Sequence, residues 1–103
     1  MNLNNFQERL NQEILQRGFN YYRENRVMKS YNEDNFIVQG SEDYEVIVKV
    51  DETGNITYSA CDCPYDFGPI CKHEAAVYFK LMEAEYEGEM VGKKKPAVFE
   101  LLN

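Results

Sequence analysis

Apolar residues near the start of the chain recur with the spacing of a helix. Four of them follow one another at intervals of three or four positions, with Asn, Gln, Glu and Arg between them: Leu3, Phe6, Leu10 and Ile14. This pattern predicts a helix over residues 3–25 with one apolar stripe. Because Gly18 is unfavourable in a helix interior, the segment could instead form two shorter helices.

The middle of the chain alternates in the manner of β-strands. Between residues 44 and 50 every second position is Tyr or Val, which gives a strand with one apolar face. Short apolar runs bounded by turn-forming residues predict strands throughout residues 27–60, at 27–31, 36–39, 44–50 and 56–60. Gly54 suits a positive φ in the tight connection before the last strand. Such short links favour an antiparallel meander of three to four strands.

A second helix is predicted over residues 71–86, where Ala, Leu, Met and Glu predominate. Its apolar residues occupy two adjoining faces, a width that favours deep packing against the sheet. Gly88 is expected to end this helix. The whole pattern predicts a small α+β domain over residues 1–87, followed by a linker or flexible tail over residues 88–103.

Size and charge limit what such a domain does. The chain has 103 residues, 44% of them hydrophobic, which is enough for one domain with a modest core. Chains this short often need a metal or a partner as well. The net charge of −7 is uneven: residues 1–30 carry +2, residues 31–92 carry −11 and residues 93–103 carry +2.

An acidic chain repels phosphate on average, so nucleic-acid binding would have to use the basic amino-terminal segment or the lysine tail. The candidate residues in that amino-terminal region are Arg17, Arg23, Arg26 and Lys29. Their alternative interpretation is a solvated helix face.

Nothing in the sequence indicates a membrane or a secretory route. No stretch of eighteen apolar residues occurs, and the amino terminus lacks a basic segment followed by an apolar run. We therefore expect a cytoplasmic protein in a reducing setting, where its three cysteines stay thiols or bind metal. Their odd number also argues against a closed disulfide framework.

All three cysteines and the only histidine lie within thirteen residues, from Cys61 to His73. Three thiolates and one imidazole complete a tetrahedral shell, and soft sulfur ligands favour zinc over magnesium or calcium. This clustering predicts one structural Zn²⁺ ion in a knuckle over residues 61–73, with the ligands Cys61, Cys63, Cys71 and His73.

The spacing of the ligands is plausible at both ends of the knuckle. Cys61 and Cys63 are alternate residues, which point the same way in an extended strand. Cys71 is expected at or just before the first helical turn, since residues two apart do not share a helix face. Three neighbouring acidic residues could accept hydrogen bonds beside the ligands or compete weakly for metal, and are interpreted as solvated surface carboxylates: Asp62, Asp66 and Glu74.

Four protein ligands leave no open coordination position, so the predicted zinc is structural rather than catalytic and the chain is predicted not to be an enzyme. The alternatives are buried core cysteines beside an unrelated histidine, a redox thiol pair and a zinc hydrolase.

The pattern C-x-C, seven residues and C-x-H resembles the SWIM zinc finger. The matching segments are Cys61-Asp62-Cys63-Pro64 and Cys71-Lys72-His73, followed by a helix with Ala75, Ala76 and Leu81. Residues 17–27 also resemble the stretch that precedes the strands in bacterial members, so the resemblance covers roughly residues 15–85. It implies a hairpin and a helix joined by zinc, and a role in binding DNA or proteins.

Bacterial helicase-like ATPases of the Swi/Snf family tend to carry a SWIM finger near the amino terminus. The resemblance therefore implies that this chain is the amino-terminal domain of such an ATPase, with the motor as a covalently linked partner. The chain itself contains no glycine-rich phosphate loop with which to hydrolyse ATP. The alternative is a stand-alone protein–protein adaptor without nucleic-acid contact. Neither reading involves a membrane or a small-molecule substrate.

Overall fold

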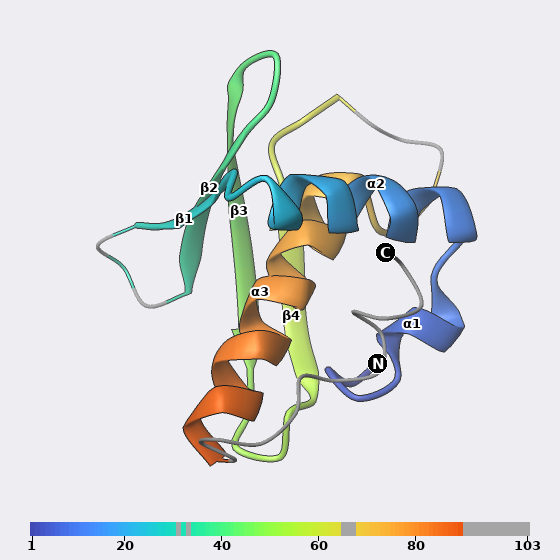
Figure 1. Cartoon of the computed structure of the whole chain (residues 1–103), viewed down its shortest axis with the longest axis vertical. Helices are drawn as coiled ribbons and strands as arrows, with labels where there is room; N and C mark the ends of the chain where they lie inside the picture. The colour runs from blue at the N-terminus through green and yellow to red at the C-terminus, as the bar shows by residue number, and fades with distance from the viewer. Residues whose placement is uncertain (31, 33, 65–67, 90–103) are drawn as a thin grey trace.

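The computed structural model describes residues 1–30, 32, 34–64 and 68–89, with side chains as far as residue 84. The elements are α1 (Phe6–Arg9), α2 (Gln12–Arg23), β1 (Val27–Lys29), β2 (Asn35–Gln39), β3 (Asp43–Val50), β4 (Ile56–Cys61) and α3 (Lys72–Glu89). The strands form one antiparallel sheet in the order β1-β2-β3-β4. α3 packs against this sheet and α2 crosses α3 (Figure 1). The predicted α+β fold with its four-stranded meander is confirmed.

The amino-terminal segment forms two helices, but the break lies before Asn11 and not at Gly18. Leu10 is extended, with φ −91° and ψ 155°. The Asn11 side chain then caps α2 by accepting hydrogen bonds from the backbone N–H groups of Glu13 at 2.8 Å and Ile14 at 3.4 Å. These first-turn amides have no partner inside the helix, so an Asn cap stabilises its start.

Gly18 lies inside α2 because the two helices cross at very short range there. A Cβ atom on Gly18 would lie 2.6 Å from the Cβ of Ala75, and 3.0 Å from both the backbone N of Ala76 and the carbonyl O of Lys72. A glycine costs about 1 kcal/mol in helix propensity relative to alanine. Here it allows α2 to fix the first turn of α3, which carries part of the candidate metal site.

Large apolar side chains fill the space between the helices and the sheet. The largest fully buried residues are Tyr78, Phe6, Phe19, Phe79, Val38, Val46, Val48 and Val77. Phe79 meets Phe6 and Phe19 edge to face, with ring centroids 5.1 and 5.3 Å apart. Burying one such side chain contributes about 1.5–3 kcal/mol, so the fold has an apolar core of its own beside any metal.

The β3–β4 connection is held by its own polar side chains. Gly54 has φ 88°, the positive value predicted for it. Asp51 Oδ1 accepts hydrogen bonds from the Thr53 hydroxyl at 2.6 Å and from the backbone N–H groups of Thr53 and Asn55 at 2.9 and 3.0 Å. The Thr53 hydroxyl, followed by the backbone amides, holds the pKa of Asp51 below its ordinary value.

α3 is longer than predicted. It ends at Glu89, so Gly88 lies within the helix and does not end it. Residues 90–103 of the predicted linker lie outside the described residues. In the part of the chain that is described, no helix is long and apolar enough to cross a membrane.

Candidate metal centre

The four predicted ligands come from two elements and the segment between them. Cys61 ends β4, Cys63 follows shortly after it, Cys71 directly precedes α3 and His73 lies in its first turn. Cys71 and His73 are buried, whereas the other two are half-buried. The four ligand atoms all lie within 4.8 Å of one another. The structure therefore positions these residues to bind one metal ion.

Asp62 holds the chain extended between the first two cysteines. Its backbone N–H donates to the carbonyl O of Glu45 at 3.2 Å, and the N–H of Glu45 donates to Asp62 Oδ1 at 3.0 Å. These bonds continue the β3–β4 pairing beyond the end of β4, so Cys61 and Cys63 act as alternate residues of an extended segment. Asp62 is exposed, as predicted, and Asp66 lies outside the described residues.

Cys71 lies just before α3, as predicted, and its sulfur caps the helix. The backbone N–H of Glu74 points at Cys71 Sγ, 3.5 Å away, and the N–H of Cys71 donates to Glu74 Oε1 at 3.1 Å. This reciprocal pair is a capping box in which sulfur takes the place of a Ser or Thr oxygen. The N–H directed at the sulfur and the positive end of the helix both favour a thiolate at Cys71.

Glu74 is not the solvated surface carboxylate that its neighbourhood in the sequence predicts, because it is only 4% exposed. Besides the Cys71 amide, it accepts a hydrogen bond from the Ser59 hydroxyl. Ser59 Oγ in turn accepts one from the Tyr78 hydroxyl at 2.7 Å. This chain of hydrogen bonds ties α3 to β4 immediately behind the ligands. The Cys-x-x-Glu spacing of a capping box is the sequence signal that could have revealed it.

His73 turns its Nδ1 atom toward the sulfurs. Nδ1 lies 3.7 Å from Cys61 Sγ and 3.8 Å from Cys71 Sγ. With Zn–S near 2.3 Å and Zn–N near 2.05 Å, a tetrahedral zinc places such atoms about 3.6 Å apart. The ring is held by Tyr44, which stacks on it with centroids 4.3 Å apart, and by Tyr21 at 5.4 Å. These distances therefore suit coordination through Nδ1.

A bound cation would change the charge state of the cluster. The adjacent Cys61 sulfur, followed by burial, raises the pKa of the Cys71 thiol, so a thiolate there needs a compensating positive charge. Nε2 of His73 is buried without a hydrogen-bond partner among the described residues, and coordination through Nδ1 would leave the ring proton on this nitrogen. A divalent cation would stabilise the thiolates and fix the imidazole tautomer. Three sulfurs and one nitrogen fit zinc.

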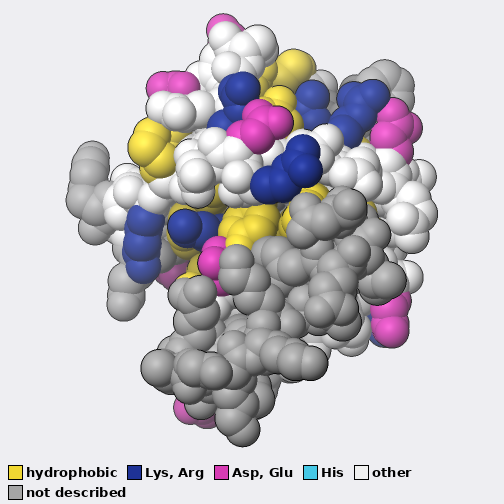
Figure 2. All heavy atoms as spheres, viewed as in Figure 1, with side chains coloured by type: hydrophobic (Ala, Val, Ile, Leu, Met, Phe, Trp, Pro, Cys, Tyr) yellow, Lys and Arg dark blue, Asp and Glu magenta, His cyan; other side chains and the backbone are white. Residues whose placement is uncertain are grey.

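The four nucleic-acid candidates fall into two groups in the structure. Arg17 and Arg26 line a cavity of about 390 Å³ beside the ligand-bearing turn of α3. Arg23 and Lys29 are exposed and do not line it. Lys and Arg side chains lie over and around α2 on the face drawn in Figure 2. Only two of the candidates are thus placed together with the metal centre.

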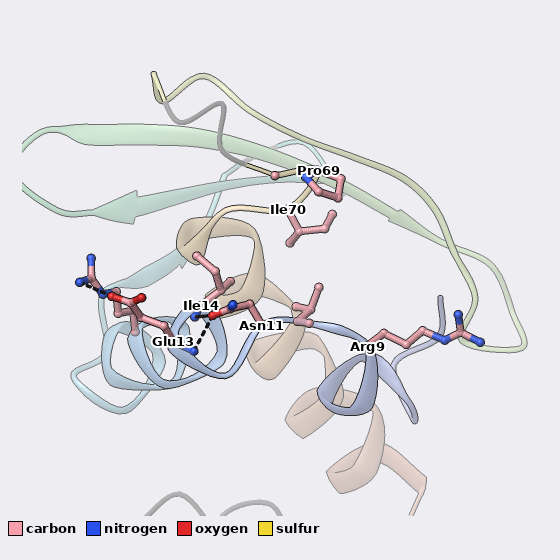
Figure 3. Close-up of a pocket in the computed structure, with 9 residues that line it drawn as sticks. Arg9, Asn11, Glu13, Ile14, Pro69 and Ile70 are labelled. Atoms are coloured by element: carbon pink, nitrogen blue, oxygen red, sulfur yellow. Dashed lines mark hydrogen bonds and ion pairs between the residues drawn. The ribbon is translucent and has the colours of Figure 1, made fainter.

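A second cavity, of about 550 Å³, lies where α1 and α2 meet the segment before Cys71. Pro69 and Ile70 face the helix junction near Ile14, while Arg9 extends away to one side (Figure 3). Ile70 is half-buried against the apolar core. The cavity borders the segment that joins the two ligand pairs, and none of its lining residues is a predicted ligand.

Comparison of the chain with protein-family models, with curated proteins and with solved structures finds no match in any of the three. The assignment of the candidate metal centre therefore depends on its residues and their geometry.

Proposed function

We propose that this chain is an interaction domain stabilised by one structural zinc ion. The observation that carries the proposal is the convergence of four ligand atoms within 4.8 Å, from Cys61, Cys63, Cys71 and His73. This donor set is typical of structural zinc sites. Because four protein ligands complete the tetrahedral shell, no position remains for the water that a catalytic zinc keeps. The zinc is therefore structural in this proposal, and the role proposed for the domain is to bind partners.

Zinc at this site joins the end of β4 to the start of α3. β4 pairs with β3 alone among the described strands, and the backbone N–H of its first residue, Ile56, donates to the carbonyl O of Met1. The metal would hold the opposite end of the strand, at Cys61. Structural zinc contributes about 10–16 kcal/mol to small zinc-binding peptides, against a net stability of about 5–15 kcal/mol for a typical domain. Most of the net stability is therefore expected to depend on the ion.

The metal content and thermal stability of the purified chain test this proposal. Elemental analysis should find about one zinc per chain, and a strong chelator should lower the Tm substantially, since ligand binding stabilises only the folded state. Cys71→Ser should lose stoichiometric zinc. Asp62→Asn is the matched control, because Asp62 lies between two ligands and its replacement keeps an acceptor for Glu45. A chain that contains no stoichiometric metal and keeps its Tm in chelator would disprove the proposal.

We further infer that the domain serves a larger helicase-like ATPase of the Swi/Snf type by binding DNA or a neighbouring domain. The support for this role is the resemblance of the Cys-x-Cys and Cys-x-His segments to the SWIM finger. Titration with short DNA duplexes at low and physiological salt tests the DNA contact. Absence of binding at low salt would remove DNA as a partner.

A protein–protein adaptor is the second candidate, favoured by the sheet face turned away from α3. Met28 and Tyr58 are 43% and 52% exposed, and strand alternation places them opposite the buried Val27 and the inward-facing Ser59. Because they belong to the two edge strands, β1 and β4, they offer two separate apolar contacts to another protein and not one continuous patch. The test is whether the domain binds the ATPase motor and changes its rate. If it does neither, this sheet face is not used to contact the motor.

A further inference from the structure

We propose that the cavity beside the metal centre binds a phosphate group. It has a volume of about 390 Å³ and lies between the second half of α2, the β2–β3 turn and the start of α3. Three cations line it, Arg17, Arg26 and Lys72. The phosphate of a nucleic-acid strand and that of a free nucleotide present the same oxygens to them. The inference builds on the proposed function, because Lys72 stands between the ligands Cys71 and His73.

The lining of the cavity is positive although the chain as a whole carries −7. Its three cations face one carboxylate, that of Glu24, which leaves a local charge of +2. Glu24 pairs with Arg26 at 2.7 Å, and Glu13, outside the lining, pairs with Arg17 at 2.7 Å. These side chains are 44–68% exposed. Exposed pairs are worth at most about 1 kcal/mol, so both arginines remain able to turn to a phosphate.

Two of the three cations share one aromatic ring. The guanidinium carbon of Arg26 lies 5.9 Å from the ring centroid of Tyr21, and Lys72 Nζ lies 5.7 Å from it. Tyr21 itself is held in place by the His73 ring. Cation–π attraction holds both charges near this ring, which itself lines the cavity. A phosphate in the cavity would therefore meet two positive charges that are already held there.

Donors remain for such a phosphate. Arg26 uses Nε for Glu24 and Nη1 for the carbonyl O of Gln39 at 3.2 Å, and Nη2 has no partner among the described residues. Within the same residues, Lys72 forms no ion pair. The β2–β3 turn can lie close to Tyr21 because Gly40 has no side chain. A Cβ atom on Gly40 would lie 3.3 Å from the Tyr21 hydroxyl oxygen. Backbone and side chains thus line an open, polar and cationic depression.

The metal centre positions this cavity. Lys72 is the first residue of α3 and has a predicted ligand on each side, so its backbone is fixed when those ligands are fixed. Phosphate binding is therefore expected to weaken when zinc is removed.

Fluorescence anisotropy of a short labelled oligonucleotide with the zinc-loaded full chain tests the cavity, at about 50 mM salt, where phosphate contacts are strong. Lys72→Gln and Arg26→Gln should each weaken binding about three- to tenfold and reduce the salt slope by about 0.7–0.9. Lys49→Gln is the matched control, because Lys49 is exposed on the opposite sheet face. It should change the affinity by less than about twofold.

Competition separates the two sources of phosphate. If a nucleic-acid backbone is the ligand, the oligonucleotide binds much more tightly than inorganic phosphate or a nucleoside monophosphate. If a free nucleotide is the ligand, the monophosphate displaces the oligonucleotide at a concentration similar to that of the oligonucleotide. Either result supports phosphate binding in the cavity.

Zinc content and Tm are measured for each variant, so weaker binding by a folded variant with one zinc reports on the cavity alone. No binding by the zinc-loaded chain, or equal binding by the Lys72 and Lys49 variants, would overturn the phosphate site and leave the structural zinc intact.

Discussion

The crossing of α2 and α3 allows a sharp test of the packing around the metal centre. Replacing an interior helix Gly with Ala normally stabilises a helix by about 1 kcal/mol. At Gly18 the added methyl would lie 2.6 Å from Ala75 Cβ and 3.0 Å from backbone atoms of Ala76 and Lys72. Carbon atoms pack at about 3.5–4.0 Å, so the helices would have to move apart by about 1 Å.

Overpacking of this kind costs about 1–3 kcal/mol, and the upper part of that range applies because backbone atoms cannot rotate away. After subtracting the gain in propensity, Gly18→Ala should lower the free energy of unfolding by about 1–2 kcal/mol. That corresponds to a fall in Tm of about 4–16 °C for a domain of this size. Urea unfolding of the zinc-loaded protein measures it, with Gln16→Ala at an exposed position of α2 as the control.

A compensating substitution tests whether the contact with Ala75 causes the loss of stability. Ala75→Gly removes the atom that the new methyl would meet first, so the double variant Gly18→Ala/Ala75→Gly should be more stable than the sum of the single changes by about 1 kcal/mol. The rescue should be partial, because the backbone contacts to Ala76 and Lys72 remain. Strictly additive effects, or a Gly18→Ala variant as stable as wild type, would show that the crossing is looser than described.

Three other predictions concern single side chains. Glu74→Ala should lower the free energy of unfolding by about 1–2 kcal/mol in urea titrations, since it removes the acceptor of the helix cap, whereas Glu74→Gln, which keeps an acceptor, should cost less. Because the pKa of Asp51 is held low, its contribution to stability is present above its unfolded pKa of about 3.9 and is lost as pH falls through the lower folded value. NMR titration of the Asp51 carboxyl should show the lowered pKa, and Thr53→Ala should raise it. In the zinc-loaded protein, ¹⁵N NMR should find the His73 proton on Nε2, and a metal on Nε2 would contradict the assigned ring orientation.

The local patterns of the sequence were sufficient for most of the fold. The alternation that buries Val46 and Val48 defines β3, and the helical spacing of apolar residues from Leu3 to Ile14 marks the region of α1 and α2. The ligand cluster was readable because all its members lie within thirteen residues. A site assembled from distant segments would have given no such signal.

The sequence-based predictions were wrong where tertiary contacts outweigh the local structural preference of a residue. Gly18 disfavours a helix locally, yet the crossing with Ala75 requires a residue without a side chain there. Glu74 carries a charge that ordinarily faces solvent, yet Ser59 and the Cys71 amide satisfy it inside the fold. The partner Ser59 lies fifteen residues away, and only the packing of β4 on α3 brings it close.

His73 connects the metal centre to the rest of the fold, which raises the question of how far the effect of the metal extends. Its ring contacts Tyr44 from β3 and Tyr21 from α2. The turn that holds it is also the turn that Gly18 crosses. Release of His73 would therefore disturb contacts of the sheet and of both longer helices.

An apolar core could in principle survive that disturbance, but the magnitudes argue otherwise. The zinc term of about 10–16 kcal/mol equals or exceeds the usual net stability of about 5–15 kcal/mol. We therefore expect chelation to raise amide hydrogen exchange at the buried Val38 and Val46 as much as at Ala75 in the first turn of α3. If protection were lost only near Ala75 while β2 and β3 stayed protected, the metal would be a local fastening and the apolar core would be sufficient for the fold.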